Sequence, residues 1–173
     1  MMPALIPVLS AEEIDLLVSD LAQRISSDYQ GRELVLVAVL KGAFIFLADL
    51  VRKLTISVKI DFVQAASYGS GTSSCGQIRL AKEIGVDIRG CDVLLVEDIV
   101  DTGLTIDWLL DYLRSFQPRS VAVCALINKR ERREREVPVA YVGRGIEKGF
   151  LVGYGLDYAE DYRHLPGIFH LKL

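Results

Sequence analysis

Three short and almost wholly apolar runs constrain the fold of this chain more than any other feature of its sequence. They are LVLVAV at residues 34–39, DVLLV at 92–96 and SVAVCALI at 120–127. Strands of a parallel sheet are apolar along their whole length in this way because helices cover both faces of the sheet. Residues 43–54 and 104–116, which lie between the runs, have the length and composition of helices. The alternation predicts an α/β domain with a mostly parallel central sheet flanked by helices.

The N-terminal segment carries a helix start signal. Ser10 and Glu13 form the S-x-x-E pattern of a capping box, in which each side chain bonds to the backbone N–H of the other residue. Gly31 is the expected stop. The residues between these signals predict an amphipathic helix. Its apolar face consists of Ile14, Leu17, Val18, Leu21 and Ile25.

Weaker patterns predict the remaining elements. Residues 57–62 alternate between apolar and polar side chains, as a half-buried strand does. Residues 67–77 are rich in Gly and Ser and predict a loop, with a returning strand at 78–82. Residues 129–138 form a charged connection, and short strands are expected within 140–155.

Composition excludes several classes of protein. A chain of 173 residues with 51% hydrophobic residues is expected to form one domain, residues 1–173, with a sizeable core. The net charge of −3 argues against a nucleic-acid-binding surface. No apolar run reaches the ~18 residues of a membrane span, and no signal peptide is recognised. Cys75, Cys91 and Cys124 lack metal-ligand spacing, which favours neutral thiols in a reducing cytoplasm.

Three carboxylates follow the apolar run at 92–96. Glu97 and Asp98 come first, then Asp101, and a Thr-Gly turn leads into the predicted helix at 104–116. The free N–H groups of a helix start would suit a phosphate, which the carboxylates would repel. Carboxylates beside a phosphate site suggest sugar hydroxyls, a bound Mg²⁺ or both. The composite ligand is a sugar phosphate with metal, although a solvated strand end with one capping carboxylate is the alternative.

Charged residues also follow the other apolar runs. Lys41 comes just after residues 34–39, and Lys129 comes just after 120–127. Ligands of open parallel sheets bind beyond the carboxyl ends of the strands, which share one edge. We therefore expect both lysines to face the same crevice as the acidic residues.

At this point the residues carry a resemblance. The stretch EDIVDTGLT at 97–105 resembles the phosphoribosyl-pyrophosphate (PRPP) motif of the type I phosphoribosyltransferases, in the form E-D-x-x-D-[TS]-G of the hypoxanthine-guanine branch. Further stretches match the family in order from about residue 35 to residue 170. They are Leu40-Lys41-Gly42, similar to the pyrophosphate loop; Ser67-Tyr68-Gly69, similar to the start of the mobile loop; Asn128-Lys129-Arg130, with the purine-selecting lysine; the segment from Phe150 to Tyr158, similar to the hood; and Arg163.

The resemblance implies the type I phosphoribosyltransferase fold, with a core at about 30–140 and a small hood from the N-terminal segment and about 140–173. It also implies Mg²⁺-dependent transfer of the 5-phosphoribosyl group from PRPP to N9 of a 6-oxopurine, in purine salvage. Hypoxanthine and guanine are the implied bases, with xanthine as a further candidate; the products are IMP or GMP and pyrophosphate. A cytoplasmic homodimer or homotetramer is implied, without nucleic acid or membrane partners.

The family roles carry over residue by residue. Glu97 and Asp98 would bind the ribose hydroxyls, directly or through Mg²⁺. Asp101 would face N7 of the purine as the catalytic general acid/base. The 5′-phosphate would be held by Asp101, Thr102, Gly103, Leu104 and Thr105.

The remaining roles concern the purine and the pyrophosphate. Lys129 would donate to O6, Phe150 would stack on the base, and the backbone of Leu151 would meet its edge. Asp157 would lie beside the purine site and hold a second Mg²⁺. Pyrophosphate would contact Lys41, Gly42 and Arg163, and the peptide bond before the lysine is expected to be cis.

Other interpretations remain open. Val142 to Glu147 departs from the family's V-G-F-E-I-P-like stretch near the base pocket, which leaves the purine preference undecided. Residues 130–136, RERRERE, have mixed signs and favour a solvated loop or helix face. The helical spacing of Tyr154, Tyr158 and Tyr162 suggests packing or an interface. A PRPP-sensing regulator and a phosphoacceptor signalling domain are the competing functions, although a phosphoacceptor domain carries its acidic pair after its first strand.

Overall fold

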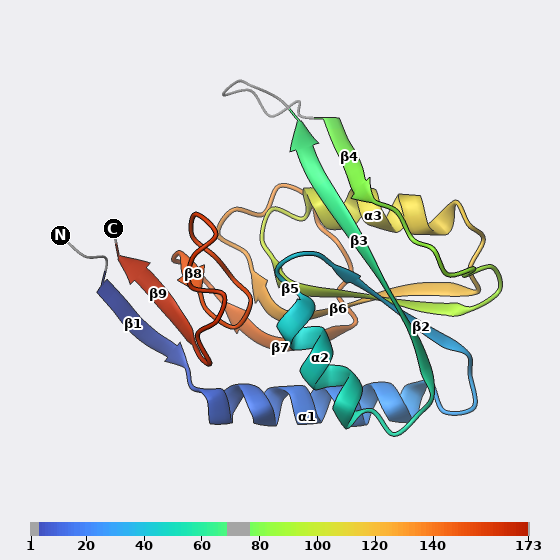
Figure 1. Ribbon diagram of the computed structural model, residues 1–173, viewed down its shortest axis with the longest axis horizontal. Helices are drawn as coiled ribbons and strands as arrows, with labels where there is room; N and C mark the ends of the chain where they lie inside the picture. Colours follow the sequence, from blue (N-terminus) through green and yellow to red (C-terminus); the bar gives the residue numbers. More distant parts are fainter. Residues whose placement is uncertain (1–3, 69–76, 173) are drawn as a thin grey trace.

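The computed structural model describes residues 4–68 and 77–172, which form two β-sheets and three helices (Figure 1). The larger sheet has six strands in the order β4-β3-β2-β5-β6-β7. Their bounds are β2 Leu34–Val39, β3 Val58–Tyr68, β4 Gln77–Lys82, β5 Asp92–Val100, β6 Ser120–Lys129 and β7 Tyr141–Ile146. The helices are α1 Ala11–Asp28, α2 Phe44–Lys53 and α3 Leu104–Arg114.

The central sheet is parallel apart from one edge strand, which confirms the predicted α/β class. β2 pairs in parallel with β3 and β5, and β6 joins β5 to β7 in the same sense; β4 runs antiparallel to β3. Alternate side chains of β2 enter two different apolar clusters. Leu36 packs with α1 and α2, whereas Val37 packs with α3. Helices therefore cover both faces, and β2 is buried throughout because neither face meets solvent.

The helix start signal is confirmed, and three strands, β3, β5 and β6, are longer than expected. Ser10 and Glu13 form the reciprocal capping box of α1, which ends just before Gly31. β5 continues beyond its apolar run to Val100, because its backbone keeps pairing with β6. Glu97 and Asp98 therefore lie inside β5 rather than after it. Lys129 is likewise the last residue of β6.

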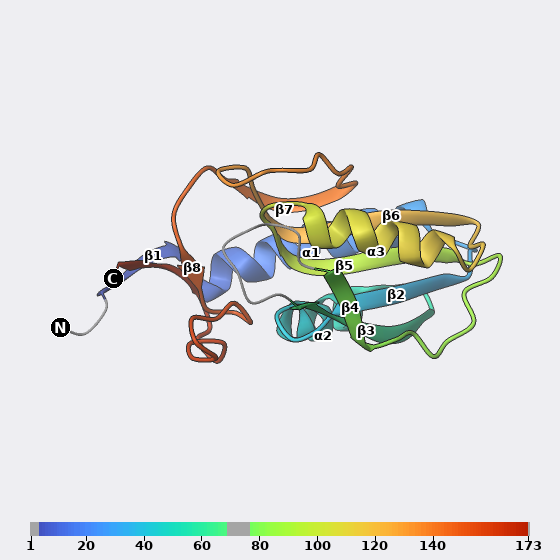
Figure 2. The same ribbon diagram turned by 90° about the horizontal axis from the view of Figure 1, so that it is seen from above.

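A second, three-stranded sheet lies at one end of the molecule, where both chain ends meet (Figure 2). It consists of β1 Ala4–Leu9, β9 Ile168–Lys172 and β8 Leu151–Val152, all antiparallel. The sequence patterns did not predict β1 or β9, since each is short and its partner comes from the opposite end of the chain.

The tyrosines at helical spacing near the C-terminus do not form a helix. Tyr154 and Tyr162 have positive φ angles, and short-range backbone bonds build tight turns, as between Gly153 and Leu156. The interpretation of Tyr154 as a packing residue holds, because its ring is buried and its hydroxyl bonds to Asp49.

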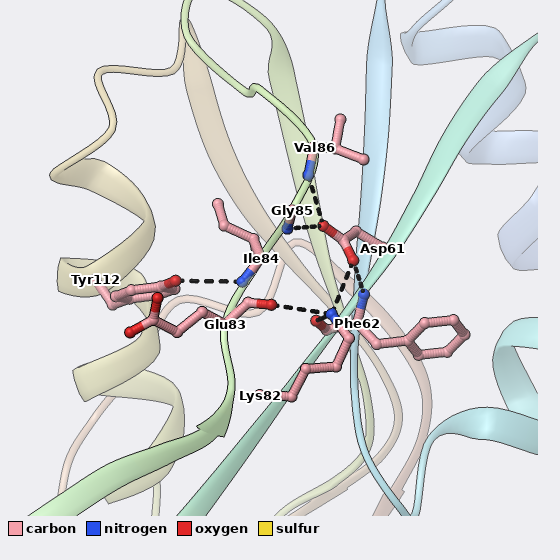
Figure 3. A network of polar contacts seen from close by, with 8 residues as sticks. All are labelled: Asp61, Phe62, Lys82, Glu83, Ile84, Gly85, Val86 and Tyr112. Carbon is pink, nitrogen blue, oxygen red and sulfur yellow. Dashed lines mark hydrogen bonds and ion pairs between the residues drawn. The ribbon is translucent and has the colours of Figure 1, made fainter.

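β3 and β4 form a two-stranded ribbon that projects from the sheet, and its base is held by Asp61 (Figure 3). Asp61 Oδ2 accepts hydrogen bonds from Gly85 N at 2.6 Å and Val86 N at 2.9 Å. Its Oδ1 accepts from Phe62 N at 2.7 Å and from Lys82 Nζ at 3.2 Å. The aspartate was expected on the polar side of a strand; instead it is buried and ties the ribbon to the loop after it.

The predicted mobile loop mostly lies outside the described residues. Ser67 and Tyr68 are the last residues of β3, and Gly69 and Cys75 belong to the part of the chain that is not described. Within residues 4–68 and 77–172, no helix has the length and apolar character needed to cross a membrane.

Candidate active site

The carboxyl ends of β2, β5 and β6 meet at one edge of the sheet, as expected. Gly42, just after β2, lies so close to β5 that a Cβ atom there would stand 2.0 Å from Asp98 Oδ2. Lys129 Nζ, at the end of β6, lies 3.6 Å from Asp101 Oδ1. The structure therefore brings the loop of Lys41, the acidic residues and Lys129 into one crevice. The peptide bond between Leu40 and Lys41 is cis, as the family resemblance implies.

Glu97 and Asp98 are adjacent buried carboxylates. Burial, and then the charge of Asp98, raise the pKa of Glu97 well above its usual value. Burial likewise raises the pKa of Asp98. Their hydrogen bonds are local: Asp98 N donates to Glu97 Oε1 and Ile99 N donates to Asp98 Oδ1. Neither carboxylate forms an ion pair among the described side chains.

This carboxylate pair fits a divalent cation. Oxygen donors are what Mg²⁺ prefers, and a cation would relieve the cost of burying two like charges side by side. Among residues 4–68 and 77–172, however, no group of three or more His, Cys, Asp or Glu side chains is placed to hold a metal by itself. Mg²⁺ at this edge would therefore complete its coordination with water or substrate oxygens, as it commonly does.

Residues 101–105, the predicted phosphate loop, lead into α3, and all of them except Leu104 line a cavity of about 140 Å³. Gly103 has a φ of 84° and precedes the first helical residue, Leu104, whose N–H donates to Thr102 Oγ1 at 3.3 Å. The first N–H groups of a helix have no partner within the helix. Together with the hydroxyl of Thr105, they make this cavity suitable for a phosphate.

The predicted hood segment contacts the predicted pyrophosphate loop, residues 40–42. Gly155, with a φ of 97°, lies so close to Gly42 that a Cβ atom would stand 2.1 Å from the carbonyl oxygen of Gly42. Arg163 donates to the carbonyl oxygen of Gly155 at 2.7 Å and lies 3.1 Å from Asp157 Oδ1. The hood thus places Arg163 and Asp157 opposite the strand ends, although they are far from Lys41 in sequence.

Glu160 joins these predicted residues and was missed by the sequence analysis. Its carboxylate lies 2.8 Å from Lys41 Nζ and 3.2 Å from Arg163 Nη2. Hydrogen bonds from Lys41 and then Arg163 lower the pKa of Glu160. No local pattern could have identified its contact with Lys41, because the two residues are 119 positions apart in the sequence.

Lys129, Phe150 and Leu151 are the residues that the resemblance assigns to the purine. Lys129 is buried and pairs with Glu131 as well as with Asp101. Leu151 is buried in β8, whereas Phe150 is 44% exposed and its ring meets Tyr158 edge to face. Gly149 N, just before Phe150, donates to Glu131 Oε2, and Glu131 lies 3.3 Å from Lys129 Nζ. Phe150 therefore offers a partly open aromatic side chain next to a residue that is linked to the buried ammonium through Glu131.

The charged segment at 130–136 is a loop whose residues are exposed apart from Arg133, so the predicted solvated loop is confirmed with one exception. The Arg133 side chain is buried against the ends of β5 and β6. The mixed charges that suggested a solvated loop gave no sign of this, because a single arginine of four turns inward.

Two buried polar atoms at the crevice lack a hydrogen-bond partner among the described side chains. Among the side chains that the structure describes, only Asp101 Oδ1 and Arg163 Nε are buried without a hydrogen bond. Buried polar groups are nearly always satisfied, so such exceptions require an explanation. Asp101 Oδ1 is an acceptor in the predicted phosphate loop, and Arg163 Nε is a donor in the predicted hood. A ligand that fills the crevice would supply a partner for each.

The fold and these groups define a class of protein: an α/β domain that binds a phosphorylated ligand beyond the carboxyl ends of its parallel strands. Comparison with protein families narrows the class, because residues 8–159 match the phosphoribosyl transferase domain. The chain belongs to this family, and the predicted type I phosphoribosyltransferase fold is confirmed. A phosphoacceptor signalling domain is thereby excluded.

Curated relatives cover nearly the whole chain. Hypoxanthine phosphoribosyltransferase of Escherichia coli (strain K12) is 45% identical over 158 residues, which are 90% of this chain and 89% of the relative. Hypoxanthine-guanine phosphoribosyltransferase of Mycobacterium avium is 46% identical over 167 residues, 93% of this chain and 82% of the relative. The crystal structure of a hypoxanthine-guanine phosphoribosyltransferase from Bacillus anthracis superimposes with a TM-score of 0.91 at 40% identity, covering 98% and 99% of the two chains.

Proposed function

We propose that this chain transfers the 5-phosphoribosyl group of PRPP to N9 of hypoxanthine or guanine, with Mg²⁺, giving IMP or GMP and pyrophosphate. The observation that carries the proposal is a pair of buried atoms without a hydrogen bond, Asp101 Oδ1 and Arg163 Nε, on the two sides of one crevice. Asp101 Oδ1 has only the ion pair with Lys129 Nζ at 3.6 Å. A proton-bearing purine suits the carboxylate, and an anionic pyrophosphate suits the guanidinium. Membership of the family and the names of the relatives support the same reaction.

Displacement of pyrophosphate from C1 of the ribose leaves negative charge on the leaving group and builds positive charge on the sugar. Lys41 and Arg163 would neutralise the leaving group, which is the electrostatic stabilisation on which such transfers depend. Bound Mg²⁺ would supply further positive charge at the phosphate oxygens. Glu97 and Asp98 would hold one Mg²⁺ and would also accept from the ribose hydroxyls, and Asp157 would hold a second Mg²⁺ on the pyrophosphate side.

Recognition of the base rests on Lys129 and Phe150. The buried ammonium of Lys129 can donate to an oxo group at C6, and the exposed ring of Phe150 can stack on the purine. An amino group at C6 would leave the buried ammonium facing another donor. Because unpaired buried polar groups discriminate strongly, adenine is expected to be a poor substrate.

The test is nucleotide formation with PRPP and Mg²⁺, using hypoxanthine, guanine, xanthine and adenine in parallel. We expect turnover of hypoxanthine or guanine and little or none of adenine. A protein that binds PRPP but converts no base would instead act as a PRPP-sensing regulator, the competing function on the same fold. Turnover of adenine at the rate of the oxopurines would overturn the proposed role of Lys129.

Asp101→Asn separates catalysis from binding. If Asp101 moves the purine proton, turnover should fall by ~10²–10⁴-fold, while PRPP affinity changes little because the phosphate loop keeps its backbone. Single-turnover kinetics and PRPP titration measure the two effects separately. Turnover near that of the wild type would remove Asp101 from the proton-transfer step.

Lys129→Ala tests selection of the base. The change should weaken discrimination against adenine or abolish turnover of oxopurines, because it removes the O6 donor. The ratio of kcat/KM for hypoxanthine to that for adenine reports the effect. A ratio equal to that of the wild type would place the lysine outside the purine site.

A further inference from the structure

A buried guanidinium holds together the ends of two strands at the crevice. The Arg133 side chain is only 7% exposed. Its Nε donates to the carbonyl oxygen of Asp101 at 2.8 Å, and its Nη2 lies 2.9 Å from the carbonyl oxygen of Lys129. Nη2 also reaches the carbonyl oxygen of Val100 at 3.2 Å and Asn128 Oδ1 at 2.6 Å. The four acceptors come in pairs, one pair from the end of β5 and one from the end of β6.

The backbone of the residues that follow Arg133 is also hydrogen-bonded to the predicted phosphate loop, residues 101–105. Glu134 N and Arg135 N both donate to the carbonyl oxygen of Thr102, at 2.9 and 3.0 Å. A Cβ atom on Gly103 would stand 2.1 Å from the carbonyl oxygen of Arg135, so the two backbones are in direct contact. Residues 130–136, which we call the bracket, therefore contact the phosphate loop through both side chain and backbone.

The acceptors of Arg133 belong to the groups that the proposed reaction uses. Asp101 is the proposed acid/base and Lys129 is the proposed O6 donor, and both carbonyl oxygens bond to the same guanidinium. Among the described residues its one ion pair is with Glu136, whose carboxylate oxygen lies 3.8 Å away on a side chain that is itself 79% exposed. The arginine thus holds two backbone segments in place, one at Asp101 and one at Lys129, and each segment carries a side chain with a proposed function.

We propose that Arg133 is a positioning residue that sets the separation of Asp101 and Lys129 around the purine. This inference rests on the proposed function. A lysine is not expected to replace it, because one ammonium cannot stand both at the position of Nε, which bonds to Asp101, and at that of Nη2, which reaches the other three acceptors. Reactive groups displaced by about 1 Å lose ~10²-fold in rate, so the consequence should appear in turnover and in base selection.

The experiment compares Arg133→Lys with Arg130→Lys, an exposed arginine of the same bracket. For Arg133→Lys we expect kcat with hypoxanthine to fall ~10–100-fold, with a smaller change in KM for PRPP. We also expect a reduced preference for hypoxanthine over adenine, because Lys129 loses its fixed place. Arg130→Lys should match the wild type in all three quantities.

A second variant covers the case in which Arg133→Lys does not fold. Asn128→Ala removes one acceptor of the guanidinium and leaves the strand backbone in place. It should lower kcat and base selectivity a few-fold in the same direction, with a circular dichroism spectrum like that of the wild type.

Either folded variant with the kcat and base selectivity of the wild type would overturn the inference. So would a loss confined to thermal stability, since that is what a purely structural arginine predicts. Wild-type turnover is measured alongside: its absence would refute the proposed function itself, whereas an active wild type with unaffected variants refutes only the role of Arg133.

Discussion

Replacing Asp61 by asparagine is expected to lower the free energy of unfolding by about 3 kcal/mol. The carboxylate accepts four hydrogen bonds, from the backbone of Gly85, Val86 and Phe62 and from Lys82. These bonds join β3 to the loop that follows β4, so they fix the base of the ribbon (Figure 3). An amide of the same shape keeps the packing and changes only the hydrogen bonding.

The magnitude follows from the geometry of the amide. Asparagine has one oxygen, so its NH₂ group must face one of the two donor pairs: Gly85 N with Val86 N, or Phe62 N with Lys82 Nζ. A buried donor left without an acceptor costs ~1–3 kcal/mol, and because these bonds are only partly buried the lower half of that range applies to each donor. Two backbone donors are lost in the first orientation, and one backbone donor with a partly exposed ammonium in the second. A loss of about 3 kcal/mol is a large part of the ~5–15 kcal/mol of a typical domain.

The assay is urea unfolding followed by circular dichroism, with Asp87→Asn as the control. Asp87 is an exposed carboxylate that accepts one bond from Arg89 N, so its loss should cost no more than ~1 kcal/mol. The urea midpoint of Asp61→Asn should fall well below that of the control at an unchanged slope. A loss under ~1 kcal/mol for Asp61→Asn would refute the argument that its donors are trapped without water.

The pH dependence provides an independent check. Burial raises the pKa of Asp61, but hydrogen bonds from the backbone of Val86, Gly85 and Phe62 outweigh it, and the net pKa lies below the usual value. A depressed pKa means that the charged form is stabilised in the folded state. This stabilisation is present above about pH 4 and is lost as the pH falls through the folded pKa. The stability difference between the wild type and Asp61→Asn should therefore shrink in acid; a constant difference would contradict the assignment.

Two further predictions concern the crevice. Gly42→Ala should lower kcat ~10²-fold with little change in unfolding temperature. The added Cβ would stand 2.0 Å from Asp98 Oδ2 and displace that carboxylate, so turnover equal to that of the wild type would show that the loop moves aside freely. Glu160→Gln should tighten inhibition by pyrophosphate ~2–5-fold, because its carboxylate pairs with both Lys41 and Arg163, and an unchanged inhibition constant would show that the pairs do not compete with pyrophosphate.

Short-range patterns were enough for the frame of the molecule. The apolar run at 34–39 predicted a strand buried on both faces, and β2 is that strand. The S-x-x-E pattern predicted the start of α1, because a capping box uses only groups three residues apart. The crevice followed from one topological rule, since carboxyl ends of parallel strands share an edge and the charged residues come at those ends.

The features that the sequence patterns missed depend on contacts between segments that are far apart in the sequence. β1 and β9 are strands because the two ends of the chain pair, and neither has a distinctive pattern of its own. Glu160 meets Lys41 across 119 residues, so nothing near it in the sequence marks it. Asp61 and Arg133 looked like ordinary surface charges, yet one collects the N–H groups of a returning loop and the other the carbonyl oxygens of two strand ends.

The sequence by itself determined the fold class, the family and the edge of the sheet where the ligand-binding groups lie, because periodicity and motif order are properties of neighbouring residues. The tertiary structure alone decided which charged side chains are buried and what they hold. A buried charge depends on the hydrogen-bond partners that distant segments bring to it, and those partners exist only once the chain has folded.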